Sequence, residues 1–280
     1  MIPVRIVLYL NYNLTLHLYL VFIVFLTGRS AVHKLSAVII TFNEENRIRP
    51  TLESLRWCDE IIVVDSGSWD KTPDICREYG NCKVYTHPFP GYGEQKNFAL
   101  EKASYDWILS VDADEVVTNS LREEIISILS LSEIPAVGFL VPITLIFMKR
   151  TFRHGCENRQ PHIRFFNKNK GNFNNLKVHE GVQVEGTVLK LKNEILHISY
   201  VDIAHYFQKF NSYSTIYQKE ALLKGKKAGK VKAVLRLPFE FFKQYFLRLN
   251  FLNGYPGFVW SLFSTFYIFV KYTKLYEANL

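Results

Sequence analysis

Apolar residues in the first half of the chain form short continuous runs, separated by segments with helical spacing. Four runs have the length and composition of strands: Leu35–Thr41, Glu60–Asp65, Lys83–Thr86 and Trp107–Asp112. Between the first two runs, Ile48, Leu52 and Leu55 recur at helical spacing. Because strands alternate with helices, the pattern predicts an α/β fold whose parallel-rich sheet is covered by helices on both faces.

Later segments are less regular. Ser120 and Glu123 have the spacing of a capping box, which predicts a helix that runs to about Leu131. Val137–Met148 is apolar and strand-like. Two shorter strand candidates and one helix follow: Ile163–Phe166, Thr187–His197 and Asp202–Leu223. The main domain is therefore expected to span residues 35–200.

Residues 1–34 form a separate hydrophobic segment. Val4–Leu26 is mostly apolar, but its uninterrupted part, Leu18–Leu26, has nine residues. A spanning helix needs about twenty. No small-residue cleavage site stands out before Gly28. The segment is compatible with an uncleaved anchor, a signal peptide or an extension outside the native fold.

The chain ends in a basic and aromatic segment, residues 201–280. Six basic residues lie between Lys224 and Arg236. Phe258–Val270 then runs for thirteen residues without a charge, which is short for a span and typical of an interfacial helix. A basic run beside tryptophan and tyrosine residues favours a helical extension that binds an anionic membrane surface over an ordinary buried helix.

Composition and charge narrow the class of protein. The 280 residues suffice for one large domain with an appendage, and a charged fraction of 21% excludes a largely disordered chain. Residues 35–135 carry nine basic and eighteen acidic side chains, whereas residues 136–280 carry twenty-two and eight. This asymmetry argues against nucleic acid as a partner. The four cysteines have no C-x-x-C spacing, which fits a reducing compartment better than a zinc site or a disulfide framework.

Polar motifs follow three of the predicted strands. They are Thr41–Glu45, Asp65–Ser68 and Asp112–Glu115. In an open parallel sheet, ligands bind at the carboxyl ends of the strands. Carboxylates clustered there are unfavourable unless a cation or a hydroxyl-rich ligand meets them. Each motif alone could be a helix cap or a turn, but three at one sheet edge predict a binding site.

The most specific of these motifs is Asp112-Ala113-Asp114. Two acids separated by one residue after a buried strand can share a divalent metal, and oxygen ligands suit Mg²⁺ or Mn²⁺. Asp112 and Asp114 are therefore the candidate metal ligands. A metal at this place would offset the repulsion between the acidic half of the chain and a diphosphate.

Together these motifs resemble family 2 glycosyltransferases. The similar segments are AVIITFNEE, EIIVVDSGSWDKT and GYGEQKNFALEKASYDWILSVDADE, followed by HxG and VHE. Within the family they are most similar to the lipopolysaccharide-core glucosyltransferase-like group. The tail from Leu237 to Glu277, with its N-G-x-x-G motif, also resembles the C-terminal extension of that group. Trp69 departs from the family pattern, in which threonine is common at this place.

The resemblance implies a GT-A fold and a nucleotide-diphosphate-sugar donor, with a UDP-sugar expected. It implies donor-binding roles for nine residues: Thr41, Phe42, Asn43, Glu45, Asp65, Gly67, Lys96, Asn97 and Asp112. Phe42 would stack on the base, and Lys96 would face the diphosphate. Asp114 would bind the metal and act in catalysis.

An inverting transferase needs a base beside the acceptor hydroxyl. Glu180 belongs to the V-H-E motif, so the resemblance implies that it is this base, with Glu157 as the second choice. His179 could orient Glu180 or ligate metal. Arg164 is a candidate for holding a phosphate or an anionic acceptor.

The expected function is inverting transfer of a sugar to a lipid-linked saccharide, such as lipopolysaccharide core, at the cytoplasmic face of the bacterial inner membrane. Two alternatives are open: a HAD-type phosphatase that uses Asp112 and Asp114, and a catalytically inactive membrane-bound scaffold. The phosphatase needs a further acidic pair downstream, but the only aspartate after Asp114 is Asp202. Intact Asp65, Asp112, Asp114 and Glu180 argue against the scaffold.

Overall fold

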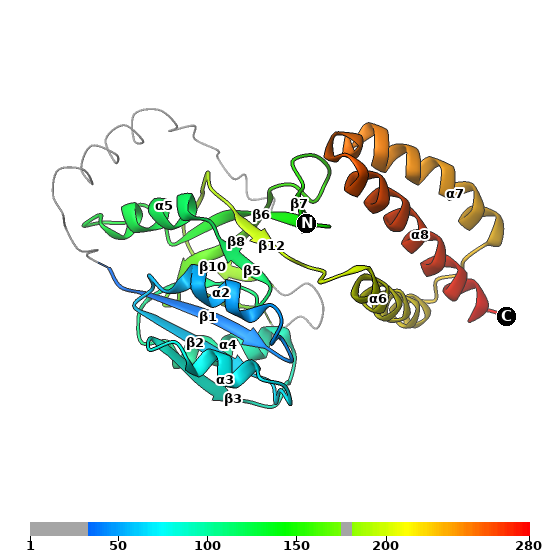
Figure 1. Cartoon of the computed structure of the whole chain (residues 1–280). Coiled ribbons are helices and arrows are strands. Elements are labelled where there is room, and N and C mark those ends of the chain that lie inside the picture. Colours follow the sequence, from blue (N-terminus) through cyan, green and yellow to red (C-terminus); the bar gives the residue numbers. More distant parts are fainter. Residues whose placement is uncertain (1–32, 175–180) are drawn as a thin grey trace, which may run out of the picture.

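The computed structural model describes residues 33–174 and 181–280. It consists of a mixed sheet with helices on both faces, followed by three long helices that lie to one side of the sheet (Figure 1). The hydrophobic segment Val4–Leu26 lies outside the described residues, as do His179 and Glu180.

The first half of the sheet is parallel. Its strand order is β3 (Cys82–Thr86), β2 (Glu60–Asp65), β1 (Leu35–Thr41) and β4 (Trp107–Ser110). All six residues of β2 are buried, because helices cover both of its faces. Thr41 pairs with Asp65 at the ends of β1 and β2, so the polar motifs that follow these two strands begin side by side.

The second half of the sheet is mixed, so the large sheet has antiparallel pairs beside the parallel ones that the sequence predicts. β8 (Gln160–Asn167) lies between β4 and β6 (Gly138–Phe147) and is antiparallel to both. β12 (Ile195–His197) then runs parallel to β6, and β5 (Glu115–Val117) runs antiparallel to β12. In the described residues no helix lies between β6 and β12 along the chain, so neighbouring strands there can pair antiparallel through short connections.

Four short strands complete the β-structure. β7 (Arg150–Thr151) and β11 (Val188–Lys190) pair with β6. β9 (Gly171–Phe173) and β10 (Val182–Val184) form a separate antiparallel pair. The predicted strand over Thr187–His197 is therefore two strands, which lie at different positions along β6.

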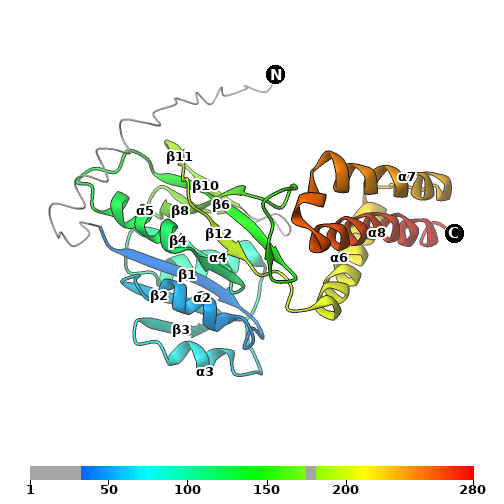
Figure 2. The same ribbon diagram turned by 45° about the horizontal axis from the view of Figure 1, so that its top comes forward.

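Helices cover both faces of the sheet, as predicted (Figure 2). The larger core cluster joins one face to α2 (Ile48–Leu55), α3 (Thr72–Arg77) and α5 (Asn119–Leu129). The second cluster joins the other face to α4 (Tyr92–Lys102). The apolar residues with helical spacing, Ile48, Leu52 and Leu55, are fully buried in the larger cluster.

The start of α5 differs from the predicted capping box. Thr118 is the N-cap: its backbone is extended, and its side chain accepts a hydrogen bond from Leu121 N at 3.3 Å. Ser120 already has a helical conformation and cannot act as the cap. A threonine and a serine two residues apart offer the same chemistry, and only the backbone conformation selects between them.

The C-terminal extension comprises α6 (Ile203–Leu223), α7 (Lys230–Phe242) and α8 (Tyr255–Glu277). A π-helical turn, η1 (Lys243–Leu247), and a 3₁₀ turn, η2 (Asn250–Asn253), join α7 to α8. An aromatic cluster attaches the extension to β6, with Trp260 of α8 5.2 Å from Phe147 between ring centroids. No helix in the described part of the chain is long and apolar enough to cross a membrane.

Two asparagines of η2 lock the extension to the β7–β8 loop. Asn253 accepts a hydrogen bond from Arg153 N at 3.0 Å and donates one to the carbonyl of His154 at 3.0 Å. Asn253 also donates to Asn250 Oδ1 at 3.0 Å. Gly257 allows α8 to pass close to this turn, because a Cβ there would lie 1.9 Å from the Asn250 carbonyl oxygen.

We expect Gly257→Ala to destabilise the fold by about 1–3 kcal/mol, because a backbone oxygen cannot move out of the way of the added methyl. Alanine is the better helix former, so helix propensity alone predicts the opposite sign. The measurement is thermal unfolding by circular dichroism. Gly80→Ala is the matched control, because a Cβ at Gly80 meets no atom within 4 Å. Equal melting temperatures of Gly257→Ala and the wild type would contradict the close approach of α8 to η2.

Candidate active site

A cavity of about 780 Å³ opens at the carboxyl ends of β1, β2 and β4. Its lining comes from the loops after these strands, from α4, from the segment after β12 and from α6. Among the lining residues are Thr41, Phe42, Lys96, Asp112 and Asp114, which were all expected in the site. Lys209 and Tyr213 of α6 also line the cavity, so the C-terminal extension contributes to it.

Asp112 is held between two basic residues. Its carboxylate forms ion pairs with Lys96 Nζ at 2.9 Å and with Arg164 Nη2 at 2.7 Å. The same Arg164 nitrogen lies 2.7 Å from Glu115 Oε1, and Glu115 Oε2 accepts a hydrogen bond from Asp112 N at 2.9 Å. Arg164 therefore bridges two carboxylates, and its expected role in holding a phosphate or an anionic acceptor stays a prediction.

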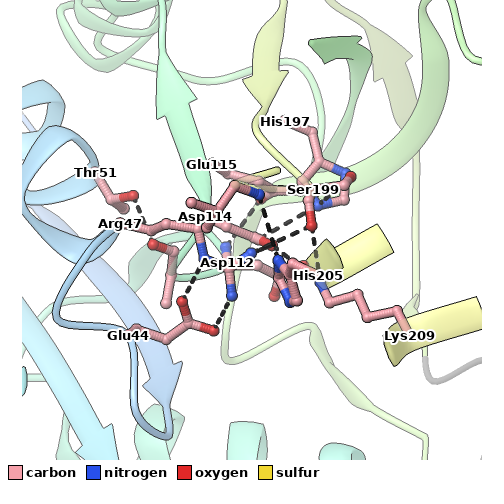
Figure 3. A network of polar contacts seen from close by, with 12 residues as sticks. Glu44, Arg47, Thr51, Asp112, Asp114, Glu115, His197, Ser199, His205 and Lys209 are labelled. Carbon is pink, nitrogen blue, oxygen red and sulfur yellow. Dashed lines mark hydrogen bonds and ion pairs between the residues drawn. The ribbon is translucent and has the colours of Figure 1, made fainter. Parts of the chain in front are cut away.

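Asp114 faces three groups that carry or can carry positive charge (Figure 3). Its carboxylate lies 3.1 Å from Arg47 Nη1, 3.3 Å from His197 Nε2 and 3.8 Å from Lys209 Nζ. The carbonyl of Ser199 accepts hydrogen bonds from both Arg47 and Lys209, at 3.3 and 3.0 Å. Arg47 also pairs with Glu44, so a chain of contacts joins the loop after β1 to the start of α6.

Burial and these ion pairs shift several pKa values. Burial raises the pKa of Asp112, but Arg164 and Lys96 outweigh it and hold the pKa well below its usual range. Burial also lowers the pKa of His197, but the hydrogen bond and charge of Asp114 outweigh it and raise the pKa overall. The pKa of Lys209 is lowered by burial, with Asp114 opposing the shift. The site therefore stabilises ionised aspartates beside a histidine that is easily protonated.

Hydrogen bonds join the loop after β1 to the loop after β2. The residues that form these bonds do not line the cavity. Asn43 N donates to Ser68 Oγ at 2.8 Å, and Asn43 Oδ1 accepts from Trp69 N at 3.1 Å. Glu45 accepts from Lys71 N at 3.1 Å. Asn43 and Glu45 thus shape the loop that carries Phe42 into the cavity lining.

Asp65 also acts within its own loop. Its Oδ1 accepts hydrogen bonds from Gly67 N at 3.0 Å and Ser68 N at 2.8 Å, and its Oδ2 accepts from Ser68 Oγ at 2.5 Å. Gly67 has φ +90, a conformation that favours glycine. Asp65 is 2% exposed and does not line the cavity. The next residue, Ser66, does line it.

Aromatic residues flank the cavity. Phe42 is 47% exposed, and its ring meets Trp69 edge-on at 5.0 Å. Phe89 and Tyr92, which also line the cavity, form a second edge-on pair at 5.0 Å. Exposed aromatic faces at a cavity rim can stack on a planar base.

Asn97 lies on α4 beside Lys96 but outside the cavity lining. Its amide donates to the carbonyl of Phe173 and accepts from Phe173 N, both at 2.9 Å. Asn97 therefore holds β9 against α4, next to Lys96.

Four residues of the charge network were not assigned to these roles from the sequence: Arg47, Arg164, His197 and Lys209. They lie on α6, in two strands and in a loop, far apart along the chain. The sequence carries a weak signal for His197, because this polar residue follows two apolar residues at the end of β12. The predicted base, Glu180, lies outside the described residues. Glu157, the second choice, does not line the cavity, and its Oε2 is buried with no hydrogen-bond partner among the described residues.

Residues 36–186 match the family model for glycosyl transferase family 2. The chain belongs to this family. This confirms the resemblance found in the sequence and removes the basis for the phosphatase alternative. The α/β fold, with its mixed sheet and flanking helices, is GT-A-like, and glycosyl transfer is the activity that family membership supports.

Relatives that are named as glycosyltransferases align with most of the chain. The lipopolysaccharide core biosynthesis glycosyltransferase LpsC of Rhizobium meliloti is 32% identical over 88% of this chain and 93% of its own length. An uncharacterised glycosyltransferase of Rickettsia conorii is 32% identical over 90% of this chain and 93% of its own length. A crystal structure of S. aureus TarS 1–349 with UDP-GlcNAc aligns with a TM-score of 0.48 at 17% identity, covering 84% of this chain and 81% of that one. A TM-score this low supports no conclusion about the ligands of this chain.

The raised pKa of His197 predicts a pH-dependent contribution to stability. A raised pKa stabilises the fold below the unfolded pKa of about 6.5, and this stabilisation is lost as the pH rises through the folded pKa. We expect the imidazole to titrate above about 6.5 in metal-free protein, and Asp114→Asn to lower its midpoint. The measurement is NMR titration of the imidazole. A midpoint that Asp114→Asn leaves unchanged would show that the ion pair does not form in solution.

Proposed function

We propose that this protein transfers a sugar, with inversion, from a UDP-sugar to a lipid-linked saccharide acceptor such as lipopolysaccharide core. The observation that supports it most directly is the cavity at the strand ends, where Asp112 and Asp114 meet the basic side chains of Lys96, Arg47 and Lys209. Family membership supports the reaction class. The relative from Rhizobium meliloti, whose name refers to lipopolysaccharide core biosynthesis, supports the acceptor class.

In this proposal an aromatic residue of the cavity binds the base of the donor, and basic residues bind its diphosphate. Phe42 offers an exposed ring at the end of β1, where a base could stack. Lys96 is 5% exposed, opens into the cavity from α4, and carries a charge suited to a diphosphate. Lys209 approaches from the other side, on α6, and would bind the same diphosphate.

The residues present fit a divalent cation such as Mg²⁺ or Mn²⁺. Asp114 lines the cavity, and its carboxylate is an oxygen donor of the kind that such an ion prefers. The described residues hold no cluster of three His, Cys, Asp or Glu side chains arranged for a metal. Phosphate oxygens and water would therefore complete the coordination, as is common for Mg²⁺.

Charge balance also favours a cation that arrives with the donor. The network joins four basic side chains (Arg47, Lys96, Arg164 and Lys209) to four carboxylates (Glu44, Asp112, Asp114 and Glu115). A diphosphate adds negative charge to this balanced set. A bound divalent ion supplies the compensating charge for the leaving diphosphate. Both aspartates are paired on both oxygens, but the partners of Asp112 lie at 2.9 and 2.7 Å and those of Asp114 at 3.1, 3.3 and 3.8 Å, so Asp114 is the stronger candidate ligand of the two.

The acceptor side of the proposal rests on the sequence. Glu180 is the proposed base that takes the proton from the acceptor hydroxyl while the sugar is transferred in a single displacement. Nucleotide sugars are made in the cytosol, so the proposed location is the cytoplasmic face of the bacterial inner membrane, where a lipid-linked acceptor is within reach.

We expect UDP with Mn²⁺ to raise the melting temperature of the wild type more than UDP alone, by mass action. Asp114→Asn should abolish the metal-dependent part, because it removes a carboxylate ligand. Asp74→Asn is the matched control, since Asp74 pairs with Arg77 at the surface and its side chain is 77% exposed. The measurement is a thermal shift with and without EDTA. If the metal-dependent part persists in Asp114→Asn, the metal is bound elsewhere.

We expect Glu180→Gln to lower turnover at saturating donor by about 10²–10⁴-fold, the usual effect of removing a general base. UDP binding should survive, because the substitution is nearly isosteric. Glu157→Gln is the matched control and should retain turnover. The assay uses a panel of UDP-sugars with lipid-linked acceptors and determines the anomeric configuration of the product. Retained configuration would exclude single displacement. Intact UDP binding without turnover of any donor by the wild type would instead support the inactive scaffold.

A further inference from the structure

The hairpin formed by α7, η1, η2 and α8 carries an apolar surface on its outside. Along α7 and η1, exposed side chains recur every three or four residues, at Leu235, Phe239, Phe242 and Phe246. On α8 the same spacing recurs at Tyr255, Phe258, Leu262 and Phe266. The turn between them exposes Leu247, Leu249, Phe251 and Leu252. We refer to these twelve residues as the apolar stripe.

Polar residues of the hairpin are buried on its other side. Six of them are less than 9% exposed: Glu240, Gln244, Asn250, Asn253, Ser261 and Thr265. This distribution is the reverse of a helix pair in water, whose apolar face is buried and whose polar face is solvated. An apolar surface of this kind on a monomer marks a site that binds another apolar phase.

Ring contacts make the stripe continuous across the two helices. Phe242 and Phe246 lie 5.2 Å apart between centroids, and Phe246 and Phe251 lie 6.4 Å apart. Tyr245 connects the turn to α8, at 6.2 Å from Phe251 and 5.7 Å from Phe258. The exposed rings therefore form one surface rather than separate side chains.

The charge around the stripe is positive. Residues 224–274 contain ten lysines and arginines and one acid, Glu240. Glu240 is 7% exposed and pairs with Lys243, so it offers little negative charge to a partner. Lys224, Lys226 and Lys227 are exposed in the segment that leads into α7.

We propose that this hairpin docks the protein onto an anionic phospholipid bilayer, with the apolar stripe inserted at the boundary of headgroups and acyl chains and the basic residues on the headgroups. The physics is that of an interfacial helix pair, which binds through apolar burial and through attraction to anionic lipids. A second copy of the chain is the less suitable occupant, because a symmetric pairing would bring two basic surfaces together.

The hairpin also fixes the position of the cavity relative to the proposed membrane. Asn253 ties η2 to the β7–β8 loop through Arg153 N and the His154 carbonyl. Trp260 and Phe147 attach α8 to β6. The docked hairpin would therefore hold the sheet and its cavity at a set distance from the lipid. The proposal deepens the lipid-linked acceptor of the proposed function, but it can be tested without any sugar transfer.

The test is co-sedimentation of the full chain with vesicles of phosphatidylcholine alone or mixed with phosphatidylglycerol. The triple variant Phe242→Ser, Phe246→Ser and Leu247→Ser should lose binding to mixed vesicles by about tenfold or more, because each side chain contributes apolar burial. The matched control replaces three exposed apolar residues of α6 outside the stripe (Ile216, Leu222 and Leu223) with serine and should bind as the wild type does. Circular dichroism and UDP binding check that both variants are folded.

The charge component is tested with Lys224→Gln, Lys226→Gln and Lys227→Gln combined. Binding to mixed vesicles should fall by up to about fivefold for each lysine and should become less sensitive to salt. Binding to phosphatidylcholine alone should stay unchanged.

Equal vesicle binding by the folded stripe variant and the wild type would overturn the proposal. So would a wild-type dimer in sedimentation velocity that the stripe variant loses, combined with no vesicle binding, because the occupant would then be a second copy. Failure of sugar transfer leaves the proposal standing if vesicle binding behaves as expected.

Discussion

The guanidinium of Arg164 is the contact on which the rest of the site depends. It lies on β8 and donates to Asp112, after β4, and to Glu115, at the start of β5. Glu115 is 1% exposed, and burial raises its pKa, so two neighbouring carboxylates would repel each other without this cation. Removing one partner of a buried ion pair typically costs about 3–5 kcal/mol. Arg164 thus permits an acidic motif to be buried at the end of a strand, and Asp114 can then face the cavity.

The contact between Arg164 and Asp112 requires β8 to lie antiparallel beside β4, and therefore a mixed sheet. Arg164 reaches Asp112 because β8 pairs with β4 directly, although β4 ends at Ser110 and β8 begins only at Gln160. The parallel half positions the three polar motifs, and the antiparallel neighbour supplies the cation that neutralises one of them. Strand pairing also positions His197, which lies at the end of β12 and next to Asp114.

Local features could be predicted from the sequence, and long-range partners could not. The bounds of β1 and β2 agree with the prediction because their apolar runs are buried on both faces. The fourth strand was expected to reach Asp112, but β4 ends at Ser110, since a residue that binds two cations at a strand end need not continue the ladder. The cap of α5 depended on a backbone conformation that the residue types do not specify.

Arg47 lies in a loop and Lys209 on α6, and only tertiary structure brings both of them to the carboxylate of Asp114. The π-helical and 3₁₀ turns of residues 243–253 interrupt the helical extension between α7 and α8. They do so because buried Asn253 of η2 binds a loop that is about a hundred residues away in the sequence. Hydrophobic periodicity cannot predict such a contact, because it is evaluated over a short window of sequence and the partner residue lies outside that window.

The position of Lys209 and Tyr213 has a consequence for how such chains can be divided. Both residues belong to α6, yet both line the cavity, so a boundary drawn at residue 200 passes through the site itself. The helical tail and the sheet are therefore not interchangeable modules. A chimera that joined this sheet to the tail of a distant relative would inherit a foreign cation beside Asp114, and with it a different electrostatic setting for whatever the cavity binds.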